Sequence, residues 1–416
     1  MKICILTIGN ELMSGRTADI NSSFIAREIN LQGWQVEAMT SVGDSFDSIK
    51  NRLNYLLTLT DVVICTGGLG PTADDITTAA IAQAFGLPLY TDENVLQKIK
   101  DIFAKYNLRW VENNAKQAVF PQGAEIIANP VGTAAGFALR VKEKLIFVIP
   151  GVPFETQRIM PEGVIPILSR YFPQPDQYSA RQTIKTFGLS EAAVDEKLKD
   201  IDFAAMGVNV GFYPVFPENH VVLISRHKTQ EEAQKNLQKA QDEVAARLQV
   251  YIFSYGEKTL EEVIAGLLTE KKLTIAVAES CTGGLITNRL TDVSGSSDYL
   301  DRGLVTYSNE AKISMLGIPA EIIEKHGAVS EETAWLMAEG VRKLSGTDLG
   351  LSSTGIAGPS GGSKEKPVGT VYLALADSKQ TICRHYTFRW DRRRNKHVFS
   401  EAALILLKDF LQGKEK

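Results

Sequence analysis

Residues 273–312 read LTIAVAESCTGGLITNRLTDVSGSSDYLDRGLVTYSNEAK, and they set the arrangement of the last third of the chain. The stretch opens with an apolar run, 273–278, that is typical of a buried strand, and an amphipathic segment follows at 285–290. Two glycines lie between them, where backbone N–H groups can approach a ligand beside a helix N-terminus that favours negative charge. A second strand-to-helix transition follows at 305–312. A hydroxyl in the first turn and a lysine in the second are the parts of a nucleophile and its base.

Four motifs in this part of the chain, taken together and in order, resemble the C-terminal domain of the CinA (competence/damage-inducible) family. They are AESCTGG at 278–284, TYSNEAK at 306–312, HGAVS at 326–330 and TGIAGP at 354–359. The resemblance implies an amidohydrolase that needs no cofactor. Its expected reaction is hydrolysis of nicotinamide mononucleotide to nicotinic acid mononucleotide and ammonia.

Ser280 and Lys312 are the expected catalytic pair of this amide hydrolysis. The reaction needs a nucleophile, a proton shuttle to the leaving nitrogen and donors for the oxyanion. Lys312 serves either as base or as the group that lowers the cost of ionising the hydroxyl, which requires an ammonium that is partly desolvated or close to other cations. Taken singly, Ser280 is more often a helix N-cap or turn residue, and Lys312 a solvated helix residue. Cys281 is an alternative nucleophile, but a small buried filler is the favoured interpretation.

The other residues of this site follow from the motifs. Tyr307 is expected to orient the lysine or relay a proton. The family's Gly-Asp-Arg motif is matched by Trp390-Asp391-Arg392, so Arg392 is the candidate catalytic arginine; Trp390 departs from the small residue there, and leaves open whether Arg392 or Lys396 meets the phosphate. The expected substrate-binding residues, of which the first three supply backbone donors for the oxyanion, are Thr282, Gly283, Gly284, Asn309, Thr354, Gly355, Gly358 and Lys396.

A second glycine-rich turn, TGGLGPTADD at 66–75, follows an apolar strand near the N-terminus. Closely spaced glycines and two carboxylates suit a phosphate on backbone N–H groups and a hard cation held by oxygen ligands. The turn is not a Walker loop, because no Gly-Lys-Ser/Thr follows. It resembles the phosphate-binding turn of molybdopterin-binding proteins, a domain that the CinA family carries at its N-terminus.

That resemblance implies hydrolysis of ADP-ribose to AMP and ribose 5-phosphate with a divalent ion, Mg, Mn or Co. The implied phosphate or nucleotide contacts are Gly9, Asn10, Glu11, Gly67, Gly68, Gly70 and Thr72, and the implied metal ligands are Asp74, Asp75 and Glu155. Alternatively, Asp74 caps the following helix and Asp75 alone is a ligand. Two further alternatives are a pterin- or nucleotide-binding module without turnover, and a competence-linked scaffold.

Alternating strands and helices predict α/β domains with mostly parallel sheets, whose ligands collect at the carboxyl ends of the strands. Residues 1–170 are expected to form a three-layer α/β/α domain like that of molybdopterin-binding proteins, and 258–413 an α/β deamidase domain. Between them, 176–253 predicts a small α+β linking or dimer-organising domain with the order strand-helix-strand-strand-helix. Residues 171–175 are expected to be a linker, 9–15 a turn and 397–411 the closing helix.

Composition narrows the classes of partner. The 416 residues carry a formal net charge of −4, which gives no electrostatic reason to expect nucleic acid. No run reaches membrane-spanning length, and the chain starts directly on a strand, so a cytoplasmic location is the default expectation. The four cysteines have no metal or redox spacing. Small nucleotides are therefore the expected partners, and the family resemblance adds a homodimer.

Overall fold

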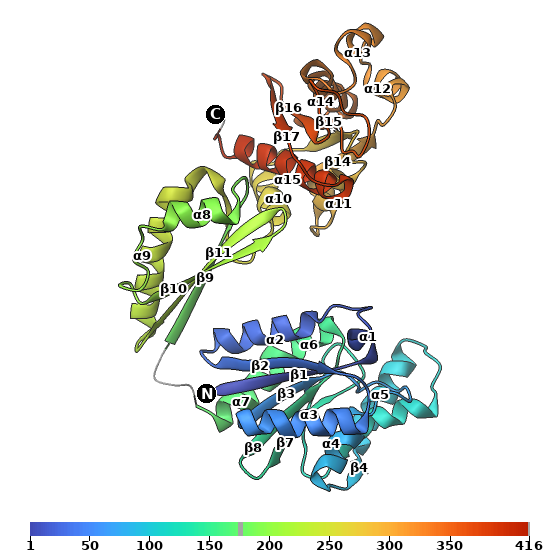
Figure 1. Ribbon diagram of the computed structural model, residues 1–416. Helices are drawn as coiled ribbons and strands as arrows, with labels where there is room; N and C mark the ends of the chain where they lie inside the picture. Colours follow the sequence, from blue (N-terminus) through green and yellow to red (C-terminus); the bar gives the residue numbers. More distant parts are fainter. Residues whose placement is uncertain (174–177, 415–416) are drawn as a thin grey trace. The chain divides into compact units, whose positions relative to one another are not determined.

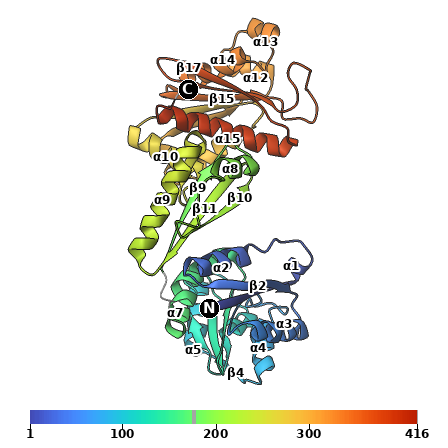
Figure 2. The ribbon, with the colours of Figure 1, turned by 60° about the vertical axis from the view of Figure 1, so that its left-hand side comes forward.

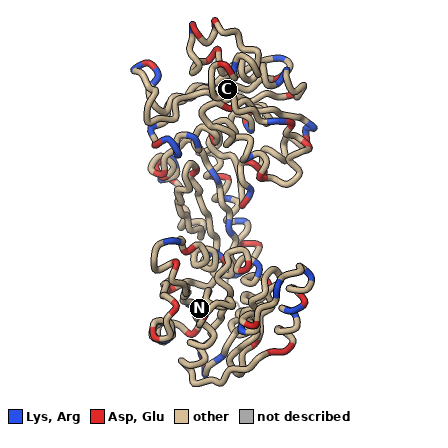
Figure 3. Tube along the Cα trace, turned by 90° about the vertical axis from the view of Figure 1, so that its right-hand side faces the viewer, with Lys and Arg blue, Asp and Glu red and all other residues tan. Residues whose placement is uncertain are grey.

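The structure is a computed structural model that describes residues 1–173 and 178–414 (Figure 1). It contains two compact units, Met1–Ala180 with Ser225–Lys235, and Arg181–Ile224 with Asn236–Lys416. Part of the linker expected at 171–175 lies outside the described residues. Basic and acidic residues are interspersed along both units (Figure 3). Among the helices described, none combines the length and the apolar character needed to cross a membrane.

The N-terminal unit is built on a six-stranded sheet with helices on both faces (Figure 1). The sheet order is β2-β1-β3-β8-β7-β6, in which the first four strands are parallel and the last two antiparallel. The strands are β1 Lys2–Ile8, β2 Gln35–Val42, β3 Val62–Thr66, β6 Glu125–Ile127, β7 Gly136–Val141 and β8 Lys144–Ile149. A separate pair consists of β4 Leu89–Thr91 and β5 Val119–Pro121.

Alternate residues of β1 pack into different cores, which explains its unbroken apolar sequence. Ile3 and Ile5 pack in the core that α2, α6 and α7 cover, whereas Cys4 and Leu6 face α3, α4 and α5. Strands covered on both faces are hydrophobic at every position. The three-layer α/β/α fold is therefore confirmed. Its helices are α1 Asn10–Met13, α2 Ile20–Leu31, α3 Phe46–Leu59, α4 Thr77–Phe85, α5 Glu93–Lys105, η1 Glu112–Ala118, α6 Pro153–Ile159, η2 Met160–Val164 and α7 Ile165–Tyr171.

The middle segment has the expected strand-helix-strand-strand-helix order and adds a last strand. Its sheet order is β10-β11-β9-β12, and β12 pairs antiparallel with β9. The elements are β9 Tyr178–Thr186, α8 Glu191–Leu198, β10 Val208–Val215, β11 Glu218–His227, α9 Gln230–Leu248, η3 Gln249–Tyr251 and β12 Ile252–Tyr255. Ser190 caps α8 by accepting a hydrogen bond from the Ala193 N–H.

The C-terminal part has a five-stranded sheet of order β14-β13-β15-β16-β17, with α15 and α10 on one face and α12 to α14 on the other (Figure 2). β14, β13 and β15 are parallel, and β16 and β17 are antiparallel. The elements are α10 Leu260–Lys271, β13 Ile275–Glu279, α11 Leu285–Thr291, η4 Ser296–Asp298, β14 Leu300–Val305, α12 Asn309–Leu316, α13 Ala320–His326, α14 Glu331–Ser345, β15 Leu349–Gly355, β16 Thr370–Ala376, β17 Thr381–Thr387 and α15 Arg392–Leu411.

Two expected boundaries are wrong. The turn expected at 9–15 contains the one-turn helix α1, in which the Ser14 N–H donates to the Asn10 carbonyl at 2.9 Å. The closing helix begins at Arg392 rather than at His397. The Asp391 side chain accepts from the Arg394 N–H and caps the helix there. The cap adds the three arginines to the helix as its first turn.

Candidate active sites

Ser280 and Lys312 meet in the C-terminal part of the chain. The Lys312 Nζ donates to the Ser280 Oγ at 3.1 Å, and also to the backbone carbonyls of Thr306 at 2.8 Å and Tyr307 at 3.3 Å. Only 8% of Ser280 and 1% of Lys312 are exposed. Burial lowers the pKa of the Lys312 ammonium below its usual range, so its neutral form is more accessible than in water. The two turns therefore bring together the hydroxyl and the amine that the sequence predicts as a pair.

Parallel strands that end at one edge of the sheet place this pair. β13 lies between β14 and β15, and beyond its end the Thr306 N–H donates to the Glu279 carbonyl at 2.8 Å. Ser308 then caps α12, the helix that carries Lys312. Because the carboxyl ends of parallel strands meet at the same edge, Ser280 after β13 and Lys312 after β14 lie side by side.

Glu279 holds the nucleophile turn, and sequence reasoning missed it. Its carboxylate is fully buried and accepts from the N–H groups of Gly284 at 2.9 Å, Ile286 at 3.1 Å and Thr287 at 2.9 Å, and from the Thr287 Oγ1 at 2.7 Å. These are the donors that a helix N-terminus leaves unpaired, and a carboxylate stabilises them. The available signal was a glutamate between an apolar strand and a Ser-x-x-Gly-Gly turn.

The expected oxyanion donors are only partly retained. The Gly284 N–H is used by the Glu279 carboxylate, and the Gly283 N–H donates to the Ser280 carbonyl at 3.2 Å. Both glycines have positive φ, of 62° and 92°, which a side chain would strain. The two glycines thus form the turn, and of the three expected amides only that of Thr282 makes no hydrogen bond within the described residues.

The side chain of Tyr307 contacts Arg392 and not Lys312 in the described interactions. The Arg392 Nη1 donates to the Gly358 carbonyl at 2.7 Å and its Nη2 to the Tyr307 hydroxyl at 3.1 Å. Tyr307 meets Lys312 through its backbone carbonyl, while its ring is 60% exposed. The expectation that the Tyr307 side chain orients Lys312 is therefore wrong: the main chain does so, and the hydroxyl holds the arginine.

Lys396 lies beside the nucleophile turn. A Cβ built on Gly283 would stand 3.5 Å from the Lys396 Nζ, so this ammonium is directly over the glycine. The Arg392 guanidinium already donates to two protein acceptors. Asn309, another expected substrate contact, is exposed and is the first residue of α12. Of the two basic candidates, Lys396 therefore lies beside the Ser280 turn, whereas Arg392 is bonded to Gly358 and Tyr307.

The threonines of the site point into the protein. The Thr354 Oγ1 donates to the Ala328 carbonyl at 2.6 Å, and the hydroxyls of Thr282 and Ser353 lie 2.6 Å apart. These bonds stabilise the turns. A Cβ on Gly355 would stand 2.6 Å from the Thr370 carbonyl oxygen, so only glycine allows the strands to approach there. Thr354 and Gly355 shape the site from behind.

Cys281 is unsuited to nucleophilic chemistry. The side chain is 5% exposed, and burial raises the pKa of its thiol to about 12. A thiol must ionise to act as a nucleophile, and burial in apolar surroundings opposes this. The interpretation of Cys281 as a small buried filler is confirmed.

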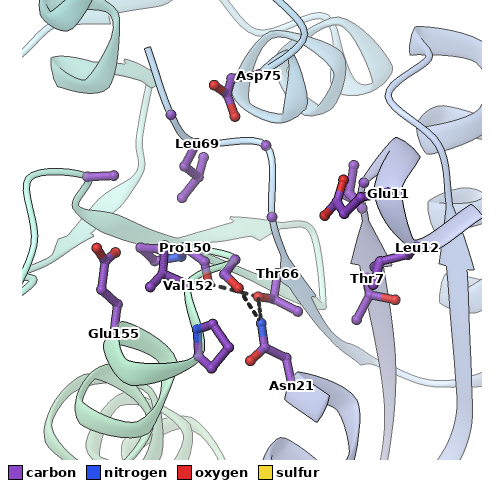
Figure 4. A pocket seen from close by; sticks show the side chains of 18 of the residues that line it. Thr7, Glu11, Leu12, Asn21, Thr66, Leu69, Asp75, Pro150, Val152 and Glu155 are labelled. Atoms are coloured by element: carbon purple, nitrogen blue, oxygen red, sulfur yellow. Dashed lines mark hydrogen bonds between the residues drawn. The ribbon is translucent and has the colours of Figure 1, made fainter. Parts of the chain in front are cut away.

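The N-terminal unit has a cavity of about 630 Å³ at the carboxyl ends of β1, β3 and β8. Glu11, Asp75 and Glu155 lie on three sides of it (Figure 4). Of the expected residues, the cavity is lined by Gly9, Glu11, Gly67, Gly68, Gly70, Asp74, Asp75 and Glu155. A Cβ on Gly67, whose φ is 110°, would stand 2.1 Å from the Ile8 carbonyl oxygen, so only glycine fits this turn.

Asn10 and Thr72 do not line the cavity themselves but form hydrogen bonds with aspartates that do. Asn10 and Asp44 are joined by two hydrogen bonds, one from each N–H to the other side chain, at 2.8 and 3.1 Å. The Thr72 hydroxyl lies 2.5 Å from a carboxylate oxygen of Asp74 and of Asp75. The N-cap of α4 is Ile76, so the alternative in which Asp74 caps that helix is wrong.

Asn21 is a further residue that the sequence did not reveal. The Thr66 hydroxyl donates to the Pro150 carbonyl at 2.8 Å, and the Asn21 Nδ2 donates to the Gly151 carbonyl at 2.7 Å and to Thr66 at 3.4 Å (Figure 4). Asn21 is buried at the start of α2. The three elements that form the cavity floor are joined through this amide.

Several negatively charged carboxylates line the cavity. Asp44, which the sequence analysis missed although it ends a strand-Gly-Asp sequence, also lines it. Burial raises the pKa of Asp44, and the charges of Glu11, Asp74 and Asp75 raise it further. Within the described parts of the chain, no three His, Cys, Asp or Glu side chains stand close enough to hold a metal ion. Carboxylate oxygens are the kind of ligand that a divalent ion binds, and Glu11, Asp44, Asp74 and Asp75 all line the cavity.

Glu155 is apart from this acidic group. The Asn129 Nδ2 donates to its carboxylate at 2.9 Å, and burial raises its pKa. The three metal ligands expected from the sequence therefore share one cavity without converging.

Family models match three segments that together cover most of the chain. They are described as "Probable molybdopterin binding domain" for residues 4–170, "Damage-inducible protein CinA KH domain" for 181–254 and "CinA C-terminal domain" for 257–411. The chain is 59% identical over 412 residues to a CinA-like protein of Syntrophus aciditrophicus, covering 99% of this chain and 98% of that one.

Other relatives are more distant. A putative competence-damage inducible protein of Caldicellulosiruptor bescii is 40% identical over 97% of this chain and 98% of its own. Among solved structures, the competence/damage inducible protein CihA of Agrobacterium tumefaciens is 39% identical, with a TM-score of 0.36. That match covers 38% of this chain and 97% of the solved one.

Proposed function

This chain belongs to the CinA family, and from that premise, together with the contact between Ser280 and Lys312, we propose that its C-terminal domain hydrolyses nicotinamide mononucleotide to nicotinic acid mononucleotide and ammonia. The main support is that Lys312 is buried and donates a hydrogen bond to the Ser280 hydroxyl, and that burial lowers the pKa of its ammonium. This is how a serine is activated where no histidine serves as base.

In the proposed reaction, neutral Lys312 takes the Ser280 proton as Oγ attacks the carboxamide carbon. The oxyanion forms near the Thr282 N–H, because the amides at the start of α11 already donate to the Glu279 carboxylate. Lys312 then gives its proton to the leaving nitrogen, ammonia departs, and water hydrolyses the acyl-serine ester to the acid. Arg392 and Lys396 are the proposed phosphate contacts: Lys396 lies beside Gly283, and Arg392 is bonded to Tyr307 and Gly358.

The test is ammonia release from nicotinamide mononucleotide by the full chain. Ser280→Ala is expected to abolish it, with Ser314→Ala, a serine of α12 whose hydroxyl only donates to the Glu310 carbonyl, as matched control. Because the proposed chemistry uses no metal, a chelator leaves the rate unchanged. Undiminished release by Ser280→Ala, or loss with chelator, contradicts the proposal.

For the N-terminal domain, we propose hydrolysis of ADP-ribose to AMP and ribose 5-phosphate with a divalent ion. The support is a cavity whose glycine turns offer backbone amides and whose walls carry Glu11, Asp44, Asp74 and Asp75. These carboxylates offer the oxygen donors that a divalent ion takes, although no three of them converge in the described structure. When bound, the ion neutralises diphosphate charge and lowers the pKa of a coordinated water. The chain's own residues orient the diphosphate on the turns at 9–11 and 66–70.

AMP formation from ADP-ribose with Mg²⁺, Mn²⁺ or Co²⁺ tests this second activity. We expect it in the wild type, and not in Asp75→Asn or with chelator. Binding of ADP-ribose without any AMP favours the alternative, a nucleotide- or pterin-binding module. The family relation also leads us to propose a homodimer active in cytoplasmic pyridine-nucleotide salvage, and light scattering of the purified chain tests the dimer.

We propose no nucleic-acid partner, although a KH model matches the middle segment. KH domains clamp nucleic acid with a Gly-x-x-Gly loop. Residues 181–254 contain no such sequence. Retention of the chain on single-stranded RNA at physiological salt contradicts this view.

A further inference from the structure

We propose that Phe216 of the middle segment is a positioning residue of the C-terminal site, which acts through Trp390 and Arg394 on the turn that presents Arg392. The inference rests on the proposed deamidation and gives the β10–β11 hairpin a role in it.

A two-residue loop brings Phe216 to Trp390. β10 ends at Val215 and β11 begins at Glu218, so the hairpin tip is Phe216-Pro217. The Phe216 and Trp390 ring centroids lie 5.3 Å apart with an interplanar angle of 79°, an edge-to-face pair. Such pairs add attraction beyond the area that they bury.

Arg394 fastens the two rings together. Its Cζ stands 5.4 Å from the centre of the Phe216 ring and 5.5 Å from that of Trp390. A guanidinium within about 6 Å of an aromatic ring is attracted by the ring's negative face. Both rings remain partly exposed, Phe216 at 42% and Trp390 at 46%, so this cluster forms on the surface from two segments far apart in sequence.

The cluster continues into the site through Asn395 and Arg392. Asn395 is fully buried, and its Nδ2 donates to the carbonyls of Trp390 at 2.8 Å and Ala357 at 3.0 Å. Arg392 lies between Trp390 and Asn395 and donates to Gly358 and to the Tyr307 hydroxyl. The backbone of Tyr307 in turn accepts from the catalytic lysine. Fixing Trp390 therefore limits where the Arg392 guanidinium can go.

The charge of Glu218, the first residue of β11, contributes to the raised pKa of Glu401 in α15, which agrees with the hairpin lying near that helix. The Glu218 carboxylate lies 2.7 Å from a ring nitrogen of His220.

The positioning role predicts a split between substrate binding and chemistry. Ser280 and Lys312 are held by strand ends and by Glu279, which Phe216 does not contact in the interactions described. Losing the ring should free the Arg392 turn and raise KM for nicotinamide mononucleotide about tenfold. The kcat should stay within about twofold, because uniform binding is what is removed.

The experiment compares full-chain Phe216→Ala with Phe216→Tyr, which keeps the ring and should restore the wild-type KM. Arg394→Gln should raise KM like Phe216→Ala, whereas Arg393→Gln, the same charge change at the neighbouring exposed residue, should not. If Phe216→Ala fails to fold, the comparison of KM between Arg394→Gln and Arg393→Gln still tests the inference. An unchanged KM in Arg394→Gln and Phe216→Ala, or a fall in kcat alone, overturns the inference.

Amide hydrogen exchange supplies a readout that needs no activity. Peptides spanning 388–396 should exchange faster in Phe216→Ala, while those of β13 stay as in the wild type. If the wild type releases no ammonia, the proposed function fails and exchange alone judges the positioning. Unchanged exchange at 388–396 in both Phe216→Ala and Arg394→Gln refutes it.

Discussion

Replacing Lys312 by methionine tests the proposed chemistry most directly. Methionine has nearly the length of lysine and is apolar, so it fills the same buried space. The change removes the amine 3.1 Å from the Ser280 Oγ and leaves the strands and the Glu279 contacts in place. We expect kcat to fall about a thousandfold, within the range for losing a positioned base. This corresponds to about 4 kcal/mol of transition-state stabilisation.

The pH profile should carry the same signature. Because burial lowers the pKa of Lys312, wild-type kcat/KM should rise with pH and level off at a pH below the ordinary lysine value of 10.5. Lys312→Met should lack this rise. Its stability should change little near pH 7, since the three lost hydrogen bonds oppose the relief of a buried ammonium.

Lys312→Arg separates the two roles left open for this residue. Arginine keeps the positive charge and cannot act as a base. Partial activity in Lys312→Arg indicates charge stabilisation, and activity as low as in Lys312→Met indicates base catalysis. Lys325→Met, at an exposed lysine of α13, is the control. The reasoning is refuted if Lys312→Met keeps a tenth of the wild-type kcat or an unaltered pH profile.

Three further substitutions test the surroundings of the two sites. Glu279→Gln puts an amide NH₂ against backbone donors, and we expect a loss of about 2 kcal/mol in the free energy of unfolding, read from urea midpoints. Burial raises the pKa of Glu401 to about 7, above the ordinary carboxyl value of 4.5. Its contribution to the stability of the fold is therefore complete below pH 4.5 and is lost as the pH rises through about 7. Over that interval the Tm should fall less in Glu401→Gln than in the wild type. Asp44→Asn should raise the metal concentration for half-maximal AMP formation about tenfold, and an unchanged metal requirement removes Asp44 from the cation site.

Much of the fold was readable because its elements bury their hydrophobic residues at regular spacing. The middle segment has the strand-helix-strand-strand-helix order that its sequence predicts, and β1 reads as one apolar run because both of its faces are covered. The misplaced start of α15 has a clear physical cause. Three consecutive arginines resemble a solvated loop, whereas a single side-chain bond from Asp391 is enough to begin a helix there.

The candidate sites were readable where a side chain would itself carry the proposed chemistry, as at Ser280 and Lys312. They were not readable where the role depends on what lies opposite. Asp44 and Asn21 matter because other strand ends face them, and the amides of Gly283 and Gly284 are used inside their own turn. A linear sequence shows which donors exist, but the fold decides which of them are already paired.

The Glu279 carboxylate bears on the proposed role of Lys312 as a base, because it is engaged away from the lysine. A carboxylate paired with a lysine raises the pKa of the ammonium. Here the carboxylate oxygens accept three backbone N–H groups and one hydroxyl of α11 and its turn. The negative charge is thereby matched to the helix N-terminus, while Lys312 faces a hydroxyl and neutral carbonyls. Burial then dominates and lowers its pKa, which is the condition that a lysine base requires.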